Sequence, residues 1–206
     1  MCYSFTVSGV SLNLPNMLKA KEKAVTGLTK GIEGLFKQNK VDYIKGHGSF
    51  LSANSIEIDL LDGGKQQIEA KNIIIATGSE VMPLPGIEID EKQIVSSTGA
   101  LDLTEVPKKM IVIGGGVIGL EMGSVWSRLG SEVTVVEFLG AVGAGMDEEI
   151  AKSFQRTLQK QGFKFKLNTK VVGAEKSDGK VKLKVEAAKG GSEETVCLAK
   201  ALIIFN

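Results

Sequence analysis

The sequence predicts an α/β fold built on a parallel sheet, with an antiparallel β-meander inserted in its second half. From residue 109 onward, strand and helix patterns alternate in the order β-α-β-α-β, which implies parallel strands joined by right-handed crossovers. Glycine is abundant, with 25 residues among 206, while aromatic residues make up only 5% of the chain. This composition favours tight turns and close packing of helices against strands.

Charge and cysteine content exclude several classes of protein. The formal net charge is +1 at pH 7, and the scattered lysines and arginines do not form the basic footprint of a nucleic-acid binder. No apolar run approaches the roughly 18 residues of a membrane span. Cys2 and Cys197 lie far apart and form no disulfide framework, so we expect a reducing compartment. Residues 1–10 lack the basic and apolar segments of a targeting sequence.

Before residue 80, the sequence predicts one helix and three strands. The helix covers residues 14–38, where apolar side chains recur at helical spacing at Leu18, Val25, Leu28, Ile32 and Leu35. Strand patterns follow at residues 41–44, 56–61 and 73–76. Asp62-Gly63-Gly64 is a turn signal between two of these strands.

Residues 80–107 have the character of a linker. They contain three of the four prolines and show little periodicity. We therefore predict a domain boundary near residues 95–107, with one domain at residues 1–100 and another at residues 101–206.

The second domain carries the clearer pattern. Strands are predicted at residues 110–113, 133–136 and 163–167, and helices at residues 117–129 and 147–161. The inner stripes of the two helices are expected to hold Ile118, Met122, Val125 and Leu129, and Ile150, Phe154 and Leu158. Asp147 is the expected N-cap of the second helix, and Gly130 and Gly162 end the two helices.

After these elements the pattern changes to short strands. Three of them form the predicted meander, because turn signals stand at residues 177–179 and 189–191. The sequence ALIIF at residues 201–205 predicts a last buried strand. A Gly-rich loop is expected earlier, at residues 138–146.

Three glycines directly follow the strand at residues 110–113, at Gly114, Gly116 and Gly119. In a strand–turn–helix context, this G-x-G-x-x-G pattern makes a tight turn, lets a pyrophosphate touch the backbone, and allows the helix to pack closely on the strand. Phosphates are favoured at the helix N-terminus by its free N–H groups and its dipole. The alternative is a Gly-rich turn needed only for packing.

Glu137 ends the next strand, about 20 residues beyond the first glycine. A carboxylate at this place accepts hydrogen bonds from both hydroxyls of the adenosine ribose and repels a 2′-phosphate. Phe138 and Leu139 follow it, so no arginine neutralises such a phosphate. The sequence therefore predicts a Rossmann-like domain that binds NAD in preference to NADP.

Other reactive residues have plainer interpretations. Glu121 is interpreted as an acid in the first helical turn that complements the helix N-terminus, with a carboxylate near the ring end of the dinucleotide as the alternative. His47, the only histidine, has no visible partner for general-base work and is expected in a loop. Cys2 and Cys197 form no short-spaced redox pair, and the sequence holds no cluster of metal ligands.

Three segments resemble a known family of enzymes. They are IIIATGSEVMPLPG at residues 73–86, the segment from IVIGGG to VVEF at residues 111–138, and FQRTLQKQGFKFKLNTKV at residues 154–171. They resemble the pyridine nucleotide-disulfide oxidoreductases, and within these the dihydrolipoamide dehydrogenases of the eukaryotic mitochondrial type. The resemblance covers about residues 10–190.

The resemblance implies cofactor contacts at particular residues. NAD is implied at Gly114, Gly115, Gly116, Val117, Ile118, Gly119, Leu120 and Glu121, with Glu137 at the ribose and Val171 beside the adenine. FAD is implied at Gly48, Thr77, Gly78 and Ser79, so residues 1–100 would be the rear part of an FAD-binding domain. The resemblance also gives Glu121 a place near the nicotinamide and the flavin.

The resemblance further implies an activity and its setting. In such enzymes dihydrolipoamide reduces an active disulfide, and FAD mediates the reduction of NAD+, in a homodimer that serves 2-oxo acid dehydrogenase complexes in the mitochondrial matrix. The family's Cys-x4-Cys pair, its own FAD glycine motif and its catalytic His-Glu pair are absent from this sequence. We therefore expect an incomplete enzyme that keeps mainly the NAD-binding half and holds no catalytic residue. The alternatives are a non-catalytic NAD-binding module and an unstable truncated product.

Overall fold

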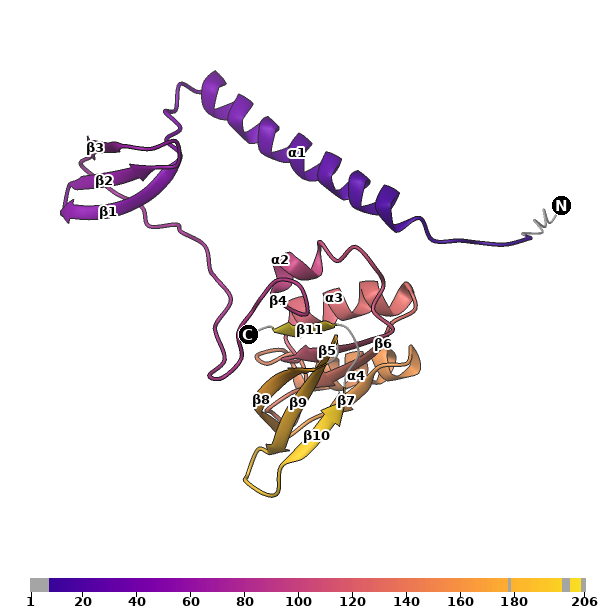
Figure 1. Ribbon diagram of the computed structural model, residues 1–206. Helices are drawn as coiled ribbons and strands as arrows, with labels where there is room; N and C mark the ends of the chain where they lie inside the picture. The colour runs from indigo at the N-terminus through magenta and orange to yellow at the C-terminus, as the bar shows by residue number, and fades with distance from the viewer. Residues whose placement is uncertain (1–7, 178, 198–200, 205–206) are drawn as a thin grey trace. The chain divides into compact units, whose positions relative to one another are not determined.

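The computed structural model describes residues 8–177, 179–197 and 201–204. The chain divides into two compact units (Figure 1). The helix–hairpin unit is Pro15–Ser79, and the parallel-sheet unit is Glu80–Asn206 together with Met1–Leu14. The division falls earlier in the chain than residues 100 and 101, and the assignment of these regions to cofactor domains stays a prediction.

The helix–hairpin unit contains one long helix and an antiparallel sheet. Helix α1, Leu14–Gln38, has the bounds that its apolar spacing predicts. The sheet has the order β1-β2-β3 and consists of Gly46–Ser52, Ser55–Leu60 and Lys65–Glu69. The predicted apolar stripe of α1 is largely exposed, since Val25, Leu28, Ile32 and Leu35 are 49%, 71%, 51% and 57% accessible.

Two of the three strands predicted in this unit are wrong. Residues 56–61 are confirmed as β2, but residues 41–44 and 73–76 are irregular. A strand needs a neighbour that completes its hydrogen-bond ladder, and no strand within the described residues pairs with either segment. Ile74 and Ile75 consequently stay 90% and 72% exposed.

The hairpins of this unit follow from local turn chemistry. Asp62-Gly63-Gly64 joins β2 to β3, and Gly63 and Gly64 adopt φ angles of 96° and 85° that glycine alone takes without strain. Strand β3 escaped prediction because its sequence, KQQIE, is almost entirely polar. His47 lies within β1, opposite Asp59 of β2, so its expected place in a loop is wrong. Residues 46–52 are small or polar in large part, and they adopt an extended conformation because they pair with β2.

The parallel-sheet unit confirms the α/β fold. Its five-stranded sheet has the order β4-β11-β5-β6-β7, with all neighbours parallel. The strands are Ile94–Val95, Ala201–Ile204, Lys109–Ile113, Glu132–Val136 and Lys164–Lys166. The last strand, β11, covers residues 201–204 of the predicted 201–205, and residue 205 lies outside the described residues.

The predicted meander is present beside this sheet. It is an antiparallel sheet of order β10-β9-β8, built from Glu194–Cys197, Lys180–Ala187 and Thr169–Ser177. Alternate residues of β9, namely Val181, Leu183 and Val185, are at most 2% exposed. They form one core with Ile111, Ile113 and Val136 of the parallel strands.

The buried faces of the two helices agree only in part with those predicted. Helix α3, Val117–Arg128, buries Gly119, Leu120, Gly123 and Trp126, whereas Ile118 is 52% exposed. A Cβ at Gly123 would lie 3.2 Å from side-chain atoms of Phe163 and Val133, so the absence of a side chain there lets the backbone of α3 pack this closely. In helix α4, Glu148–Lys160, the predicted burial of Leu158 is confirmed and Phe154 is half-buried, whereas Ala151 takes the place expected for Ile150, which is 56% exposed.

The predicted caps of the helices are present. The Asp147 carboxylate accepts hydrogen bonds from the backbone N–H groups of Glu149 and Ile150 at the start of α4. Gly130 and Gly162 follow the two helices with φ angles of 111° and 100°. Among the described residues, no helix is both long and apolar enough to cross a bilayer.

Residues 80–107 are more than a linker. They contain strand β4 and the short helix α2, Ser97–Ala100, and they bury Ile87, Ile94 and Val95. The Trp126 indole N–H of α3 donates to the Ala100 carbonyl over 3.0 Å, which ties α2 to α3. A two-residue strand and a four-residue helix are too short for periodicity to reveal them.

Candidate functional site

The Gly-rich turn connects the end of β5 to the start of α3. Gly114 has a φ angle of 101° and donates its N–H to the Val136 carbonyl over 2.9 Å. Gly116 is the N-cap residue, and within the described residues no side chain caps this end of α3. The leading N–H groups of α3 are therefore available to an anion.

The Glu137 carboxylate is held against this turn. Its Oε2 accepts the Gly115 N–H over 2.6 Å, and its Oε1 accepts the Leu139 N–H over 2.7 Å. A Cβ at Gly115 would lie 3.2 Å from Glu137 Oε2 and 3.2 Å from Val142 Cγ1. A side chain at position 115 would therefore displace the Glu137 carboxylate, and glycine avoids this. Each carboxylate oxygen can accept a further hydrogen bond.

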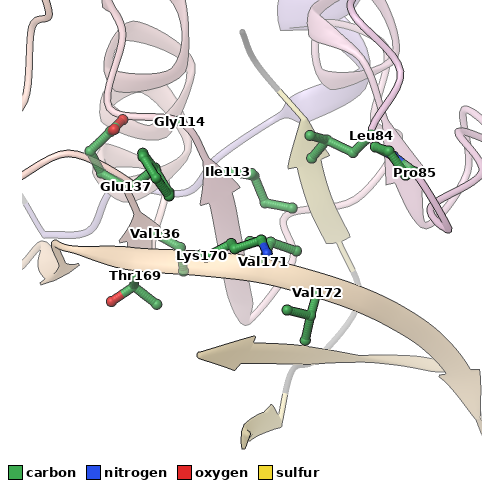
Figure 2. A pocket seen from close by; sticks show the side chains of 11 residues that line it. Leu84, Pro85, Ile113, Gly114, Val136, Glu137, Thr169, Lys170, Val171 and Val172 are labelled. Carbon is green, nitrogen blue, oxygen red and sulfur yellow. The ribbon is translucent and has the colours of Figure 1, made fainter. Parts of the chain in front are cut away.

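A cavity of about 560 Å³ opens beside the carboxylate (Figure 2). Such a volume lies within the range of small-molecule sites, roughly 300–1,000 Å³. Its lining residues are Leu84, Pro85, Ile113, Gly114, Val136, Glu137, Phe138, Thr169, Lys170, Val171 and Val172. The wall is mainly apolar, and Glu137 and Lys170 are its charged residues; the Lys170 ammonium pairs with Glu186 Oε1 at 3.1 Å.

The structure brings three of the proposed NAD residues to one cavity. Gly114, Glu137 and Val171 all line it, although Gly114 follows β5, Glu137 follows β6 and Val171 lies in β8. Around them, Gly115 touches the Glu137 carboxylate, while Gly119 and Leu120 are buried against the core. Val117 and Ile118 stand exposed at the start of α3.

The placement of Glu121 corrects one interpretation. Its side chain is exposed one full turn beyond Val117, where α3 begins, and the first turn of α3 holds no acidic residue. Interaction with the helix N-terminus falls off beyond the first turn. The reading of Glu121 as a residue that complements this terminus is therefore wrong.

The proposed FAD residues lie in the helix–hairpin unit. Gly48 is part of β1, whereas Thr77, Gly78 and Ser79 lie in an irregular, exposed segment. Two depressions in this unit are lined by residues around Tyr43. The assignment of the four residues to FAD stays a prediction.

The sequence alone does not point to several of the cavity residues. Leu84 and Pro85 lie in the segment predicted as a linker, and Thr169, Lys170 and Val172 flank the predicted adenine residue Val171. The signal in the sequence is Asn168 in the segment LNTKVV, because asparagine tolerates the left-handed backbone conformation of tight turns. In the structure Asn168 has a φ angle of 49° and turns the chain into β8. The Asn168 N–H also donates to the Leu139 carbonyl over 2.9 Å, which joins this turn to the loop after Glu137.

A charged pair joins the segment before β4 to β8. Asp90 Oδ2 lies 2.7 Å from the Lys176 ammonium, and its Oδ1 accepts the backbone N–H groups of Lys92, Gln93 and Ile94. Burial opposes ionisation of Asp90. The ion pair with Lys176 and the three N–H donors outweigh it and hold the pKa of the carboxyl well below its usual range.

A parallel sheet, a Gly-rich turn and an acid at the end of the next strand define a Rossmann-like α/β protein. The family model for pyridine nucleotide-disulphide oxidoreductase matches residues 4–204, and the chain belongs to this family.

Curated relatives confirm the resemblance to dihydrolipoamide dehydrogenases. The chain is 61% identical to dihydrolipoamide dehydrogenase of Chaetomium thermophilum over 92% of its length, and 58% identical to mitochondrial dihydrolipoyl dehydrogenase 1 of Arabidopsis thaliana over 98%. It is also 61% identical over 92% to the human mitochondrial dihydrolipoyl dehydrogenase. The chain spans only 38–40% of the length of these relatives.

Solved structures show the same fold. The HOCl-induced flavoprotein disulfide reductase RclA of Escherichia coli matches 91% of this chain with a TM-score of 0.74 and 28% identity. Its copper(II) complex matches with a TM-score of 0.77 and 26% identity. The chain covers 41% of each of these structures.

Proposed function

We propose that the parallel-sheet unit binds NAD(H), and that the chain supplies the NAD-binding part of a dihydrolipoamide dehydrogenase. The observation that carries this proposal is the Glu137 carboxylate, fixed between the Gly-rich turn and a cavity of nucleoside size. The N–H groups at the start of α3 would hold the phosphates. Glu137 would accept the ribose hydroxyls, and Val171 would lie beside the adenine.

The reaction of the whole enzyme needs more than this chain's residues. When bound, NAD+ supplies the hydride acceptor, and the protein supplies binding and orientation. The sequence holds no Cys-x4-Cys pair, which is the redox group that the resemblance implies for the oxidation of dihydrolipoamide. The polypeptide alone should therefore bind NAD+ without turning over dihydrolipoamide. Two of its relatives are named as mitochondrial, which supports a mitochondrial place for this chain. The matrix, the homodimer and the 2-oxo acid dehydrogenase complexes stay proposals that follow from the family resemblance.

Calorimetric titration of the 206-residue chain with NAD+ tests the binding site. Wild type should show one site, and Glu137→Ala should weaken binding about tenfold or more, because a charged hydrogen-bond acceptor is lost. Glu132→Ala is the matched control, since Glu132 lies exposed at the opposite end of β6. Glu137→Gln should narrow the preference for NAD+ over NADP+. Equal heats for wild type and Glu137→Ala would contradict the proposal.

Two further measurements test whether this chain binds flavin and whether it turns over dihydrolipoamide. An absorption spectrum of the purified chain should show little or no flavin. An assay with dihydrolipoamide and NAD+ should yield no NADH above background. Robust turnover by this polypeptide would show that the missing disulfide is not essential.

A further inference from the structure

One wall of the cavity is built by a segment without regular secondary structure. Leu84 and Pro85 line the cavity and belong to the irregular stretch before β4. Figure 2 shows them on the side of the cavity away from Glu137, above the strand that carries Val171 and Val172. Among the described residues no strand ladder fixes Leu84 and Pro85, so the position of this wall depends on local turn hydrogen bonds and on side-chain contacts.

Asp90 is the polar anchor of the segment. Its Oδ1 accepts three backbone N–H groups, those of Lys92, Gln93 and Ile94, each over 2.9 Å. Its Oδ2 meets the Lys176 ammonium at 2.7 Å, with the two side chains 24% and 37% exposed. Lys176 lies on β8, the same strand that supplies Val171 and Val172 to the cavity. The pair therefore ties the irregular wall to the opposing strand.

Tight packing links this anchor to the wall. The Ile87 N–H donates to the Leu84 carbonyl over 3.1 Å, and Ile87 is only 7% exposed. Ile87 belongs to the core that contains Ile113 and Val136, while Leu84 and Ile89 pack against that core. We therefore expect a displacement of Asp90, next to Ile89 in the chain, to be passed on to Leu84 and Pro85, because closely packed side chains transmit displacement.

We propose that the Asp90–Lys176 pair positions the cavity wall that receives the adenosine half of the dinucleotide. This inference rests on the proposed function of the same site. Neither residue lines the cavity, so both are positioning residues that act through Leu84, Pro85 and β8. An ion pair this accessible contributes little to global stability, and its loss should change ligand affinity more than the unfolding transition.

Titration of the 206-residue chain with ADP-ribose tests this role, because this probe carries the adenosine and pyrophosphate without the nicotinamide ring. Lys176→Met should weaken binding about threefold, and Asp90→Ala about tenfold, since it also frees three N–H groups. Lys176→Arg keeps the charge and should bind like wild type. Lys184→Met is the matched control, because it breaks the Lys184–Glu175 pair between β9 and β8 without touching the wall.

The outcomes separate the positioning role from the binding site itself. Wild-type affinity in folded Lys176→Met and Asp90→Ala would overturn the inference, as would equal losses in Lys184→Met and Lys176→Met. If Asp90→Ala does not fold, the comparison of Lys176→Met with Lys176→Arg decides. Failure of the wild-type chain to bind ADP-ribose would instead overturn the proposed function.

Discussion

Two apolar segments of similar sequence adopt different structures: one is irregular and exposed, and the other is a buried strand. KNIIIATG at residues 71–78 is irregular, and its Ile74 is 90% exposed. KMIVIGGG at residues 109–116 contains β5, Lys109–Ile113, which lies between β11 and β6, and its Ile111 is fully buried. Both run into glycines and both carry β-branched residues. An apolar run therefore indicates a capacity for strand formation, and the neighbouring strands decide the outcome.

The helices of the two units repeat this contrast. In α1, Leu28 and Leu35 are 71% and 57% exposed, whereas Leu120 in α3 is 1% exposed. Burial of apolar surface is the main favourable term in folding. The parallel-sheet unit should thus carry most of the measurable stability, and the helix–hairpin unit should respond weakly to substitution.

The largest expected difference comes from the two isoleucines themselves. Ile111→Ala should lower the free energy of unfolding by about 3 kcal/mol, because it leaves a cavity in the core. Ile74→Ala should change it by no more than about 0.5 kcal/mol. Denaturant unfolding followed by far-UV circular dichroism measures both, because helices and strands of both units contribute to this signal. Fluorescence of Trp126, the single tryptophan and 3% exposed, then reports the parallel-sheet unit separately. Equal losses for the two variants would break the comparison.

A smaller difference is expected at two glycines with positive φ. Gly114 and Gly78 have φ angles of 101° and 76°, which disfavour any residue with a Cβ. Gly114→Ala should destabilise the parallel-sheet unit by about 2 kcal/mol, because the ladder between β5 and β6 prevents relaxation. Gly78→Ala should have little effect, since its unpaired segment can relax. The same denaturant transition checks both, and a large loss in Gly78→Ala would contradict the contrast.

The smallest expected effect depends on pH. The pKa of Asp90 is lowered in the folded state, by contacts that overcome its burial. Its contribution, on the order of 1 kcal/mol, is complete above the unfolded pKa of about 3.9 and is lost as pH falls toward the folded pKa.

Asp90→Asn removes this dependence. The stability gap between wild type and variant should be widest at neutral pH and shrink as pH falls below about 4. The exposed Glu33–Lys45 pair of the helix–hairpin unit, broken by Glu33→Gln, serves as the comparison and should shift the transition less. A gap that stays constant with pH would exclude Asp90 as its source.

Features that depend on residues close together in the chain could be predicted from the sequence, and features that depend on distant partners could not. The turn from β5 to α3 and the acid after β6 could be predicted, because strand, turn and helix follow directly along the chain. The polar strand β3 and the buried face of α3 could not, since they depend on partners such as β2 and Phe163. Leu84 and Pro85 reach the cavity only through long-range packing at Ile87, which leaves no local pattern.

The position of β11 in the sheet has a consequence for the order of folding. It inserts between β4 and β5, yet it follows them only after the whole stretch from α3 to β10. Its ladders with Met110–Ile113 close a very long loop, and contacts of this kind slow folding. During synthesis β4 and β5 cannot form their ladders with β11 until residues 201–204 have left the ribosome. Vectorial synthesis thus makes closure of this sheet a late event and leaves its centre open to aggregation until then.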